Sequence, residues 1–304
     1  MVCKLDIEIP NVNAFCYETD EDLPKSHQQT LVNGARGSGK TIAICNLIKK
    51  MKYDRIFWVS PTVRSNQTIM SMLKIRDEDI YEDIDDITIP DQIKAEIEEE
   101  ARLYDEYHEK MKKYKLFIKQ KEYKNVIDDE LLMEFFNPNT DQFDKPEHWL
   151  NGRRAHMCCC YDDCLGSNLF SKGARKITNM AILHRHLGSV VSNGGGALGC
   201  SKFYLTQSYK TQHGGIPKAV RNNCTSLIIF KTKSDKELVE LQEEVGAEVS
   251  KECFYKIYNY ATAEPHSFLF IDMHPKENHV SKYRKNFNEF ICITPDTESL
   301  TSIE

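Results

Sequence analysis

The chain has 304 residues, 40% of them hydrophobic, and a formal net charge of −6. This length allows one large α/β domain or two small ones, and the charge argues against a surface broadly built to bind DNA. No run reaches the ~18 apolar residues of a membrane span, and the charged start, MVCKLDIEIP, is unlike a signal peptide. The eleven cysteines show no regular spacing, which favours reduced thiols in a cytosolic compartment.

Six short apolar runs along the chain predict β-strands. They are continuous hydrophobic segments without alternation, which is typical of strands covered on both faces. The runs occupy residues 30–33, 55–60, 155–162, 202–207, 225–230 and 267–271. Amphipathic patterns between them predict helices at 40–52 and 173–187. This succession predicts an α/β fold with a mostly parallel sheet flanked by helices.

The segment LVNGARGSGKTIAI (Leu31–Ile44) carries the pattern G-x-x-x-x-G-K-[ST] between a strand and an amphipathic helix. In such a loop the backbone N–H groups point at phosphate oxygens, and the following helix adds the positive end of its dipole. Lys40 is expected to reach the β- and γ-phosphates, and the Thr41 hydroxyl suits Mg²⁺. The sequence therefore predicts a site for a nucleoside triphosphate. The loop residues are Gly34, Ala35, Arg36, Gly37, Ser38, Gly39, Lys40 and Thr41.

Residues 65–150 interrupt the alternation of strands and helices. The run DEDIYEDIDDITIPD (77–91) holds eight acidic residues and no basic one, and without it the chain would be slightly positive. Such a run is typical of a solvated loop or a partner-facing strip, so any contact with nucleic acid must come from a confined basic patch. Residues 93–124 predict a long helix, acidic in its first half and rich in Lys in its second. We expect a helical insertion that packs on its own body or else contacts another subunit or a partner.

A pair of acidic residues closes the third run. HMCCCYDD has the pattern of a buried strand that ends in Asp162 and Asp163. Beside a phosphate loop, Asp162 would hold Mg²⁺ through water, and Asp163 would orient or deprotonate the attacking water. The three cysteines at 158–160 are expected to pack in the core, because adjacent strand residues point to opposite faces and ligate one metal poorly.

The fourth run, KFYLTQ, ends in the polar residue Gln207. If this strand lies between the strands that precede the phosphate loop and the paired acids, its end faces the γ-phosphate. An amide in that place can sense the γ-phosphate or position water. The alternative is an ordinary hydrogen-bonded Gln at the end of a strand.

Two short patterns also fit a GTPase. DCLG (Asp163–Gly166) matches D-x-x-G, and TKSD (Thr232–Asp235) matches the guanine-reading [NT]-K-x-D after an apolar strand. A switch GTPase has no need of paired acids followed by a strand that ends in Gln, which argues against this interpretation. A GTPase is therefore kept only as the alternative. A strong preference for GTP, abolished by Asp235→Ala, would support it.

With the phosphate loop, the paired acids and the strand-end Gln in this order, the sequence resembles the genome-packaging ATPases of large eukaryotic DNA viruses and virophages, within the FtsK–HerA superfamily. The resemblance covers roughly residues 29–64 and 153–272. Its most specific part is YLTQSYKTQHGGIPKAVRNN, a Gln-ended strand followed by a segment that reaches Arg221. It also includes WVSPT (Trp58–Thr62), CCCYDDCL and the pair Arg185-His186.

This resemblance implies a RecA-like ASCE core, a homo-oligomeric ring, and hydrolysis of Mg-ATP coupled to the movement of double-stranded DNA into a capsid. It also implies a catalytic arginine that one subunit gives to its neighbour, and the matching arginines are Arg185 and Arg221. In the family the Arg-His pair usually lies only a few residues before the Gln strand, whereas Arg185 precedes Gln207 by 22 residues. Capsid or portal-vertex proteins are implied partners, and the host cytoplasm (the viral factory) and the virion are implied locations.

Contact with DNA would be made to the backbone, without regard to sequence. Two basic segments beside the motifs suit it. Their basic residues are Lys172, Arg175 and Lys176 in the first, and Lys210, His213 and Lys218 in the second. An alternative of another class is a capsid assembly factor that does not translocate DNA and uses ATP as a conformational latch. A helicase or segregation pump of the same superfamily is the third possibility.

These observations divide the chain into four parts. An N-terminal segment (1–28) precedes an ATPase core (29–64 and 151–294), which the acidic and helical insertion (65–150) interrupts. The residues after the core (295–304) are polar and are expected to form a mobile tail.

Overall fold

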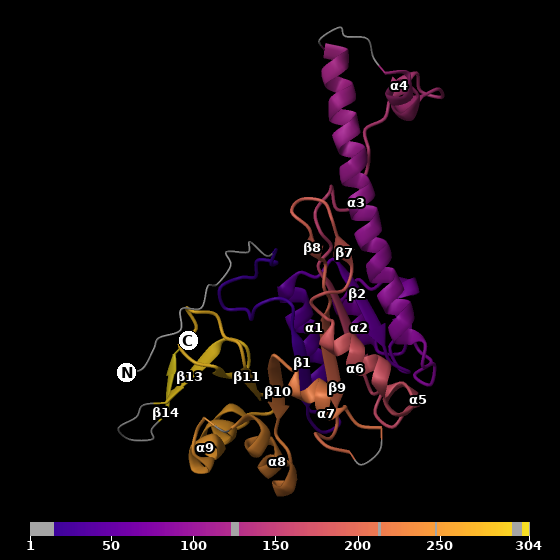
Figure 1. The fold of residues 1–304 in the computed structure, drawn as a ribbon. Helices are drawn as coiled ribbons and strands as arrows, with labels where there is room; N and C mark the ends of the chain where they lie inside the picture. The colour runs from indigo at the N-terminus through magenta and orange to yellow at the C-terminus, as the bar shows by residue number, and fades with distance from the viewer. Residues whose placement is uncertain (1–14, 123–127, 212–213, 247, 294–299, 304) are drawn as a thin grey trace, which may run out of the picture.

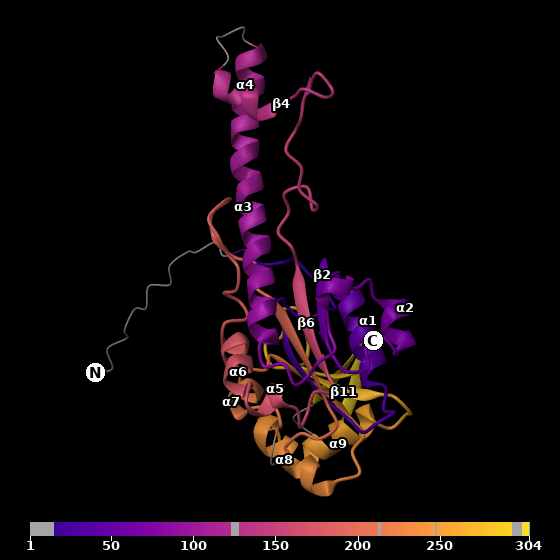
Figure 2. The same ribbon diagram turned by 90° about the vertical axis from the view of Figure 1, so that its right-hand side faces the viewer.

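The computed structural model describes residues 15–122, 128–211, 214–246, 248–293 and 300–303. At their centre lies a ten-stranded sheet in the order β14-β13-β12-β11-β10-β1-β9-β6-β2-β3. Helices cover both faces of this sheet, and one long helix rises far above it (Figures 1 and 2).

The sheet has a parallel half and an antiparallel half. The parallel strands are β1 (Gln29–Asn33), β2 (Arg55–Val59), β3 (Ile80–Tyr81), β6 (Met157–Asp162), β9 (Ser201–Thr206) and β10 (Ser226–Phe230). The antiparallel strands are β11 (Phe268–Asp272), β12 (Tyr283–Lys285), β13 (Glu289–Ile293) and β14 (Leu300–Ile303). All six predicted runs lie in this sheet, so the predicted α/β fold is confirmed, although the last run pairs antiparallel with β10.

The two faces of the sheet are covered by different helices. One face packs against α1 (Lys40–Met51) and α2 (Gln67–Met72). The other packs against α3 (Ile89–Glu122), α5 (Asn168–Ser171), α6 (Ala174–Ile182), α7 (Lys218–Asn222), α8 (Asp235–Val245) and α9 (Lys251–Ala261). Because both faces are covered, β1, β6, β9 and β10 are buried along their whole length. None of the helices in the described residues is long and apolar enough to span a membrane.

Two segments differ from the expectation. The helix predicted at 173–187 ends at Ile182, because the chain turns there and the His184 Nδ1–H donates to Ala181 O (2.8 Å), a carbonyl of the last helical turn. Part of the expected mobile tail forms β14, whose backbone pairs with the edge strand β13. Residues 294–299 and 304 lie outside the described part of the chain.

The predicted long helix is α3, which has 34 residues and is therefore about 50 Å long. Its lower part packs on the sheet through Ile97, Ala101 and Tyr104, which are buried. Its upper end stands clear of the core in both views (Figures 1 and 2). There α4 (Asp129–Phe135) and the hairpin of β4 (Phe136–Asn137) and β5 (Gln142–Phe143) pack against Phe117 and form a small aromatic cluster.

A buried ion-pair cluster joins the segment 65–150 to the core. Arg55 of β2 contacts Asp79 (2.6 Å) and Glu100 of α3 (3.0 Å). The three side chains are 5%, 1% and 5% exposed. Asp79 directly precedes β3, which pairs with β2 at the edge of the sheet. The cluster thus fixes the base of the long helix on the sheet.

We expect Arg55→Ala to lower the free energy of unfolding by about 3 kcal/mol, because it removes the buried guanidinium that pairs with both Asp79 and Glu100. Urea unfolding followed by circular dichroism measures this change. The matched control is Arg64→Ala, whose ion pairs with Asp77 and Glu82 are half exposed and which should cost less than about 1 kcal/mol. Equal losses in the two variants would contradict the prediction.

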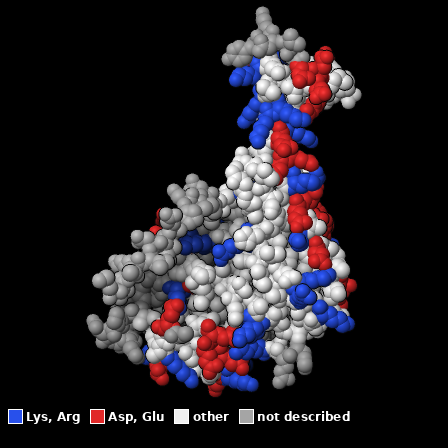
Figure 3. All heavy atoms as spheres, in the orientation of Figure 1, with Lys and Arg blue, Asp and Glu red and all other residues white. Residues whose placement is uncertain are grey.

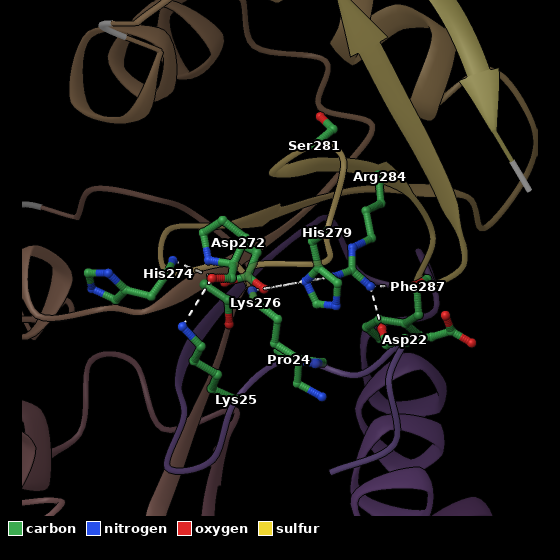
Figure 4. Close-up of polar contacts among 12 residues, drawn as sticks. Asp22, Pro24, Lys25, Asp272, His274, Lys276, His279, Ser281, Arg284 and Phe287 are labelled. Atoms are coloured by element: carbon green, nitrogen blue, oxygen red, sulfur yellow. Dashed lines mark hydrogen bonds and ion pairs between the residues drawn. The ribbon is translucent and has the colours of Figure 1, made fainter. Parts of the chain in front are cut away.

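The antiparallel half of the sheet holds the N-terminal segment in place (Figure 4). Arg284 of β12 is fully buried and donates to the backbone oxygens of Asp22 and Phe287. His279 donates through Nε2 to Glu21 O (2.7 Å) and accepts at Nδ1 from Arg284 (2.9 Å). His279 is therefore neutral, and burial lowers its pKa. These contacts anchor the chain just before β1 and its phosphate loop.

Candidate nucleotide-binding site

The phosphate loop follows β1 and leads directly into α1. Gly37 and Gly39 have φ angles of 77° and 104°, which favour glycine. A Cβ at Gly34 would lie 2.8 Å from Phe230 Cβ, so glycine is also required for the close approach to β10. Lys40 is buried and folds back over the loop, with Nζ 2.8 Å from Gly34 O. Burial lowers the pKa of Lys40, although Asp163 and Asp162 act in the opposite direction.

The residues predicted to hold Mg²⁺ lie side by side. Thr41 Oγ1 is 3.4 Å from Asp162 Oδ2, and Asp162 is 4% exposed. Burial and the neighbouring Asp163 raise the pKa of Asp162 to about 6, because together they outweigh the opposing effects of Lys40 and Thr41. Among the described residues no group of three or more His, Cys, Asp or Glu side chains could hold a metal. A hydroxyl and one carboxylate nevertheless suit Mg²⁺, which takes its other ligands from phosphates and water.

Asp163 and Gln207 meet beside this pair. Gln207 Nε2 donates to Asp163 Oδ1 at 3.1 Å, and both side chains are exposed. Asp163 follows the end of β6 with φ 53°, a left-handed conformation that Asp tolerates better than most residues. Gln207 follows β9, which lies between β1 and β6, the position that would bring its end to the γ-phosphate. The phosphate loop, the paired acids and Gln207 therefore share one edge of the sheet.

A glutamate on α8 connects these segments, and none of the motifs in the sequence marks it as a site residue. Glu237 accepts from Tyr209 N (2.7 Å), Thr232 Oγ1 (2.6 Å) and Asn33 Nδ2 (3.2 Å). It thus connects α8 to the end of β1 and to the backbone just after Gln207. Ser234 and Glu237 have the spacing of a capping box, and Ser234 does accept from Glu237 N. The sequence signal was therefore one of helix capping and not of a site.

The two predicted arginines lie apart from the phosphate loop. The Arg221 side chain is 11% exposed. Its Nε forms an ion pair with Glu244 of α8 (3.4 Å), and its Nη1 donates to Ile216 O (2.8 Å). Arg185 is exposed and lines a cavity of about 250 Å³ with Thr225, Ser226 and Asp272. Ser226 begins β10, so this cavity lies at the amino ends of the parallel strands, at the sheet edge opposite the phosphate loop.

The basic segments are partly neutralised within the chain. Lys176 pairs with Asp91 (2.6 Å) and Lys210 with Glu244 (2.9 Å). Lys172, Arg175 and Lys218 are exposed, and His213 lies outside the described residues. The cysteines at 158–160 are buried free thiols, as expected from their place in β6.

The patterns that matched a GTPase have local structural roles. The Gly166 N–H donates to Gly214 O (2.9 Å). Thr232 donates to Glu237, and Ser234 caps α8, in which Asp235 is the first residue. These contacts explain both patterns without a guanine base.

A cavity of about 690 Å³ opens beside the loop and α1. It is lined by Lys40 and Thr41 on one side and by Phe268 and Phe287 of the antiparallel half on the other. His266, which also lines it, contacts Ser38 O through Nδ1 (3.1 Å). A cavity with aromatic walls next to a phosphate loop has the size and lining for the base and ribose of a nucleotide.

No family model matches the chain, and no curated protein matches it. Among solved structures it is similar to the DNA-packaging ATPase B204 from Sulfolobus turreted icosahedral virus, with 13% identity, a TM-score of 0.45, and 85% of this chain and 96% of that chain covered. It is also similar to the genome packaging NTPase B204 from Sulfolobus turreted icosahedral virus 2 in complex with AMPPCP, with 12% identity, a TM-score of 0.44 and the same coverage. A third match is the pCW3 conjugation coupling protein TcpA monomer with ATPγS, with 14% identity, a TM-score of 0.41, and 86% of this chain and 67% of that chain covered. At these TM-scores the similarity carries no conclusion on function.

Proposed function

We propose that the protein hydrolyses Mg-ATP and uses the energy to translocate double-stranded DNA, and that it packages a viral genome. The observation that carries the hydrolytic part is the meeting of Gln207 with Asp163 (3.1 Å), next to Asp162, Thr41 and the phosphate loop. A second, exposed carboxylate beside the proposed Mg²⁺ ligand favours hydrolysis over simple binding of the nucleotide. The DNA and packaging parts rest on the resemblance of the motifs.

In the proposed mechanism, the loop N–H groups, Lys40 and the start of α1 hold the β- and γ-phosphates. Thr41 and Asp162 would hold Mg²⁺, which would offset the charge that develops on the transferring phosphoryl group. Asp163 orients the attacking water and accepts its proton. Gln207 fixes the Asp163 carboxylate and responds to loss of the γ-phosphate.

The segment after Gln207 offers a route from the nucleotide to the surface. Tyr209 donates through N to Glu237 and through its hydroxyl to Glu244, and Lys210 also pairs with Glu244. A shift of Gln207 would therefore be transmitted to α8 and to the basic segment that contains Lys210 and Lys218.

We propose that the protein works as a homo-oligomeric ring in which an arginine of one subunit completes the neighbour's site. Arg185 is the better of the two arginines for this role, because it is exposed and lies far from its own phosphate loop, whereas Arg221 is engaged by Glu244. Capsid or portal-vertex proteins would be the partners, and the host cytoplasm and the virion the locations.

Phosphate release by the purified protein, measured with and without duplex DNA, tests this function. We expect Mg-ATP hydrolysis that duplex DNA stimulates severalfold. Hydrolysis that DNA does not change would favour the assembly factor, and strand separation would favour a helicase. A preference for GTP that Asp235→Ala abolishes would favour the switch. Absence of hydrolysis under all conditions would refute the enzyme.

A further inference from the structure

The long helix α3 keeps one face toward the core along its lower part. This face follows the spacing of three and four residues that aligns side chains along a helix. Ala101 is buried against the core, and Asp105 accepts the backbone N–H groups of Val191 (2.9 Å) and Ser192 (2.8 Å) next to the hairpin of β7 (Ser189–Val190) and β8 (Gly196–Ala197). His108 contacts Gly152 O (3.0 Å) at the top of the packed region.

The same spacing continues upward to three lysines. Lys112, Lys115 and Lys119 follow His108 at intervals of four, three and four residues, and all three are exposed. We call them the lysine stripe. Above the core, the partners of α3 lie on its opposite side, where Phe117 packs against Phe135 (5.7 Å between ring centroids). As far as the described residues go, the face that is packed below is therefore uncovered above.

The charge on this part of the helix is of one sign. Residues 110–121 contain six lysines and no acidic residue. Figure 3 shows basic side chains gathered in the upper part of the molecule, where α3 stands clear of the core. Lys113 is neutralised by Glu134 (3.1 Å), and Lys121 lies over the ring of Phe143 (4.6 Å). Within the described part of the chain, the stripe lysines form no ion pair. Their charge is free for a partner outside the subunit.

The composition of the stripe favours a phosphate backbone. Protein interfaces are depleted of Lys and enriched in Arg and aromatic residues, whereas Lys is a point charge that suits contact with phosphates irrespective of sequence. From Lys112 to Lys119 the stripe spans about 10 Å of helix axis, along which B-DNA presents about six phosphate charges. The upper part of α3, which carries the stripe, also stands well away from α1, the helix that follows the phosphate loop (Figure 1).

We propose that the lysine stripe is a second, sequence-independent contact for duplex DNA. It holds the duplex beside the upper part of α3, above the ATPase core. The stripe deepens the proposed function and rests on it. The contact is electrostatic and uses no base edges, so a moving duplex can slide along it.

The test is the binding of a fluorescein-labelled 30-base-pair duplex to the whole protein, followed by fluorescence anisotropy between 50 and 200 mM NaCl. The variant is the triple change Lys112→Gln, Lys115→Gln and Lys119→Gln on exposed positions of α3. We expect weaker binding and a salt slope of log K that is smaller by about 2 to 3, since each phosphate contact contributes about 0.9. The rate of ATP hydrolysis without DNA should stay at the wild-type value.

The matched control removes the same charge elsewhere, through Lys49→Gln, Lys74→Gln and Lys251→Gln, all exposed and away from the stripe. It should leave the salt slope unchanged. Wild-type affinity and slope in the stripe variant would overturn the proposal. The proposal would also be overturned if the stripe variant bound DNA normally but no longer bound a labelled poly-glutamate peptide. That result would assign the stripe to an acidic protein. If wild-type protein lacks ATP hydrolysis and the stripe still governs DNA binding, the proposed function fails and the stripe stands.

Discussion

Replacing Asp163 with Asn is expected to slow ATP hydrolysis by about 10³-fold, the usual magnitude for loss of a general base. The amide keeps the size of the carboxylate and tolerates the left-handed backbone at this position (φ 53°). It can also still accept the hydrogen bond from Gln207. The lost rate would therefore report the missing charge and not a disturbed geometry. Phosphate release at saturating Mg-ATP measures it.

Binding separates this role from a structural one. Because Lys40, Thr41 and the loop N–H groups are untouched, the affinity of Asp163→Asn for ATPγS, measured by calorimetry, should stay near that of the wild type. Asp141→Asn is a matched control, since Asp141 is exposed and has φ 55°. A variant Asp163→Asn that keeps half of the wild-type rate, or that loses nucleotide binding as well, would remove Asp163 from the proposed mechanism.

Lowering the pH from 7.5 to 5 is expected to reduce the free energy of unfolding by about 4 kcal/mol through two buried histidines. His156 and His184 are 4% and 6% exposed. Burial lowers the pKa of each to about 4, from an ordinary value of 6.5. For His156 the positive charge of Arg153 lowers the pKa further, while Asp54 acts in the opposite direction. His184 accepts at Nε2 from Arg185 (3.4 Å), a hydrogen bond that needs the neutral ring.

The sign follows from which state takes up protons. Between pH 6.5 and 4 the unfolded chain protonates these rings and the folded chain does not, so stability is present above pH 6.5 and is lost as the pH falls toward 4. At pH 5 each histidine accounts for about 2 kcal/mol. Urea unfolding at both pH values measures the effect.

Substitution isolates the contribution of each histidine. His156→Gln and His184→Gln should each reduce the difference in unfolding free energy between the two pH values by about 2 kcal/mol. His186→Gln, at an exposed position, is the control and should leave the difference unchanged. If neither buried variant alters the difference, acid sensitivity arises elsewhere in the chain.

Local features of the sequence were enough to predict much of the site. Three features each come at the end of an apolar run: the glycine-rich loop, the acids at 162–163, and Gln207. The carboxyl ends of parallel strands meet at one edge of a sheet. Their convergence was therefore predictable once the runs were taken as parallel strands. The position of β9 between β1 and β6 was only a condition of that prediction, because strand order depends on pairing between distant segments.

Other residues could be placed only by the tertiary structure. Glu237 has the local pattern of a helix cap, yet its carboxylate binds Asn33 and Tyr209, which lie about 200 and 30 residues away in the chain. Likewise, nothing near Arg221 in the sequence indicates that Glu244 engages it. Pairing of charges across segments is a long-range property that composition and periodicity do not contain.

The sequence by itself determined the phosphate loop, the buried strands and the residues at their ends, because these depend on backbone freedom and hydrophobic pattern within a few residues. Only the tertiary structure decided that Arg185 lies at the opposite edge of the sheet, that the last strands turn antiparallel, and that the lysine stripe continues a packed face of α3. Those outcomes depend on which segments, distant in the chain, bury their apolar surfaces against one another. Patterns within a few residues of the sequence do not specify these pairings.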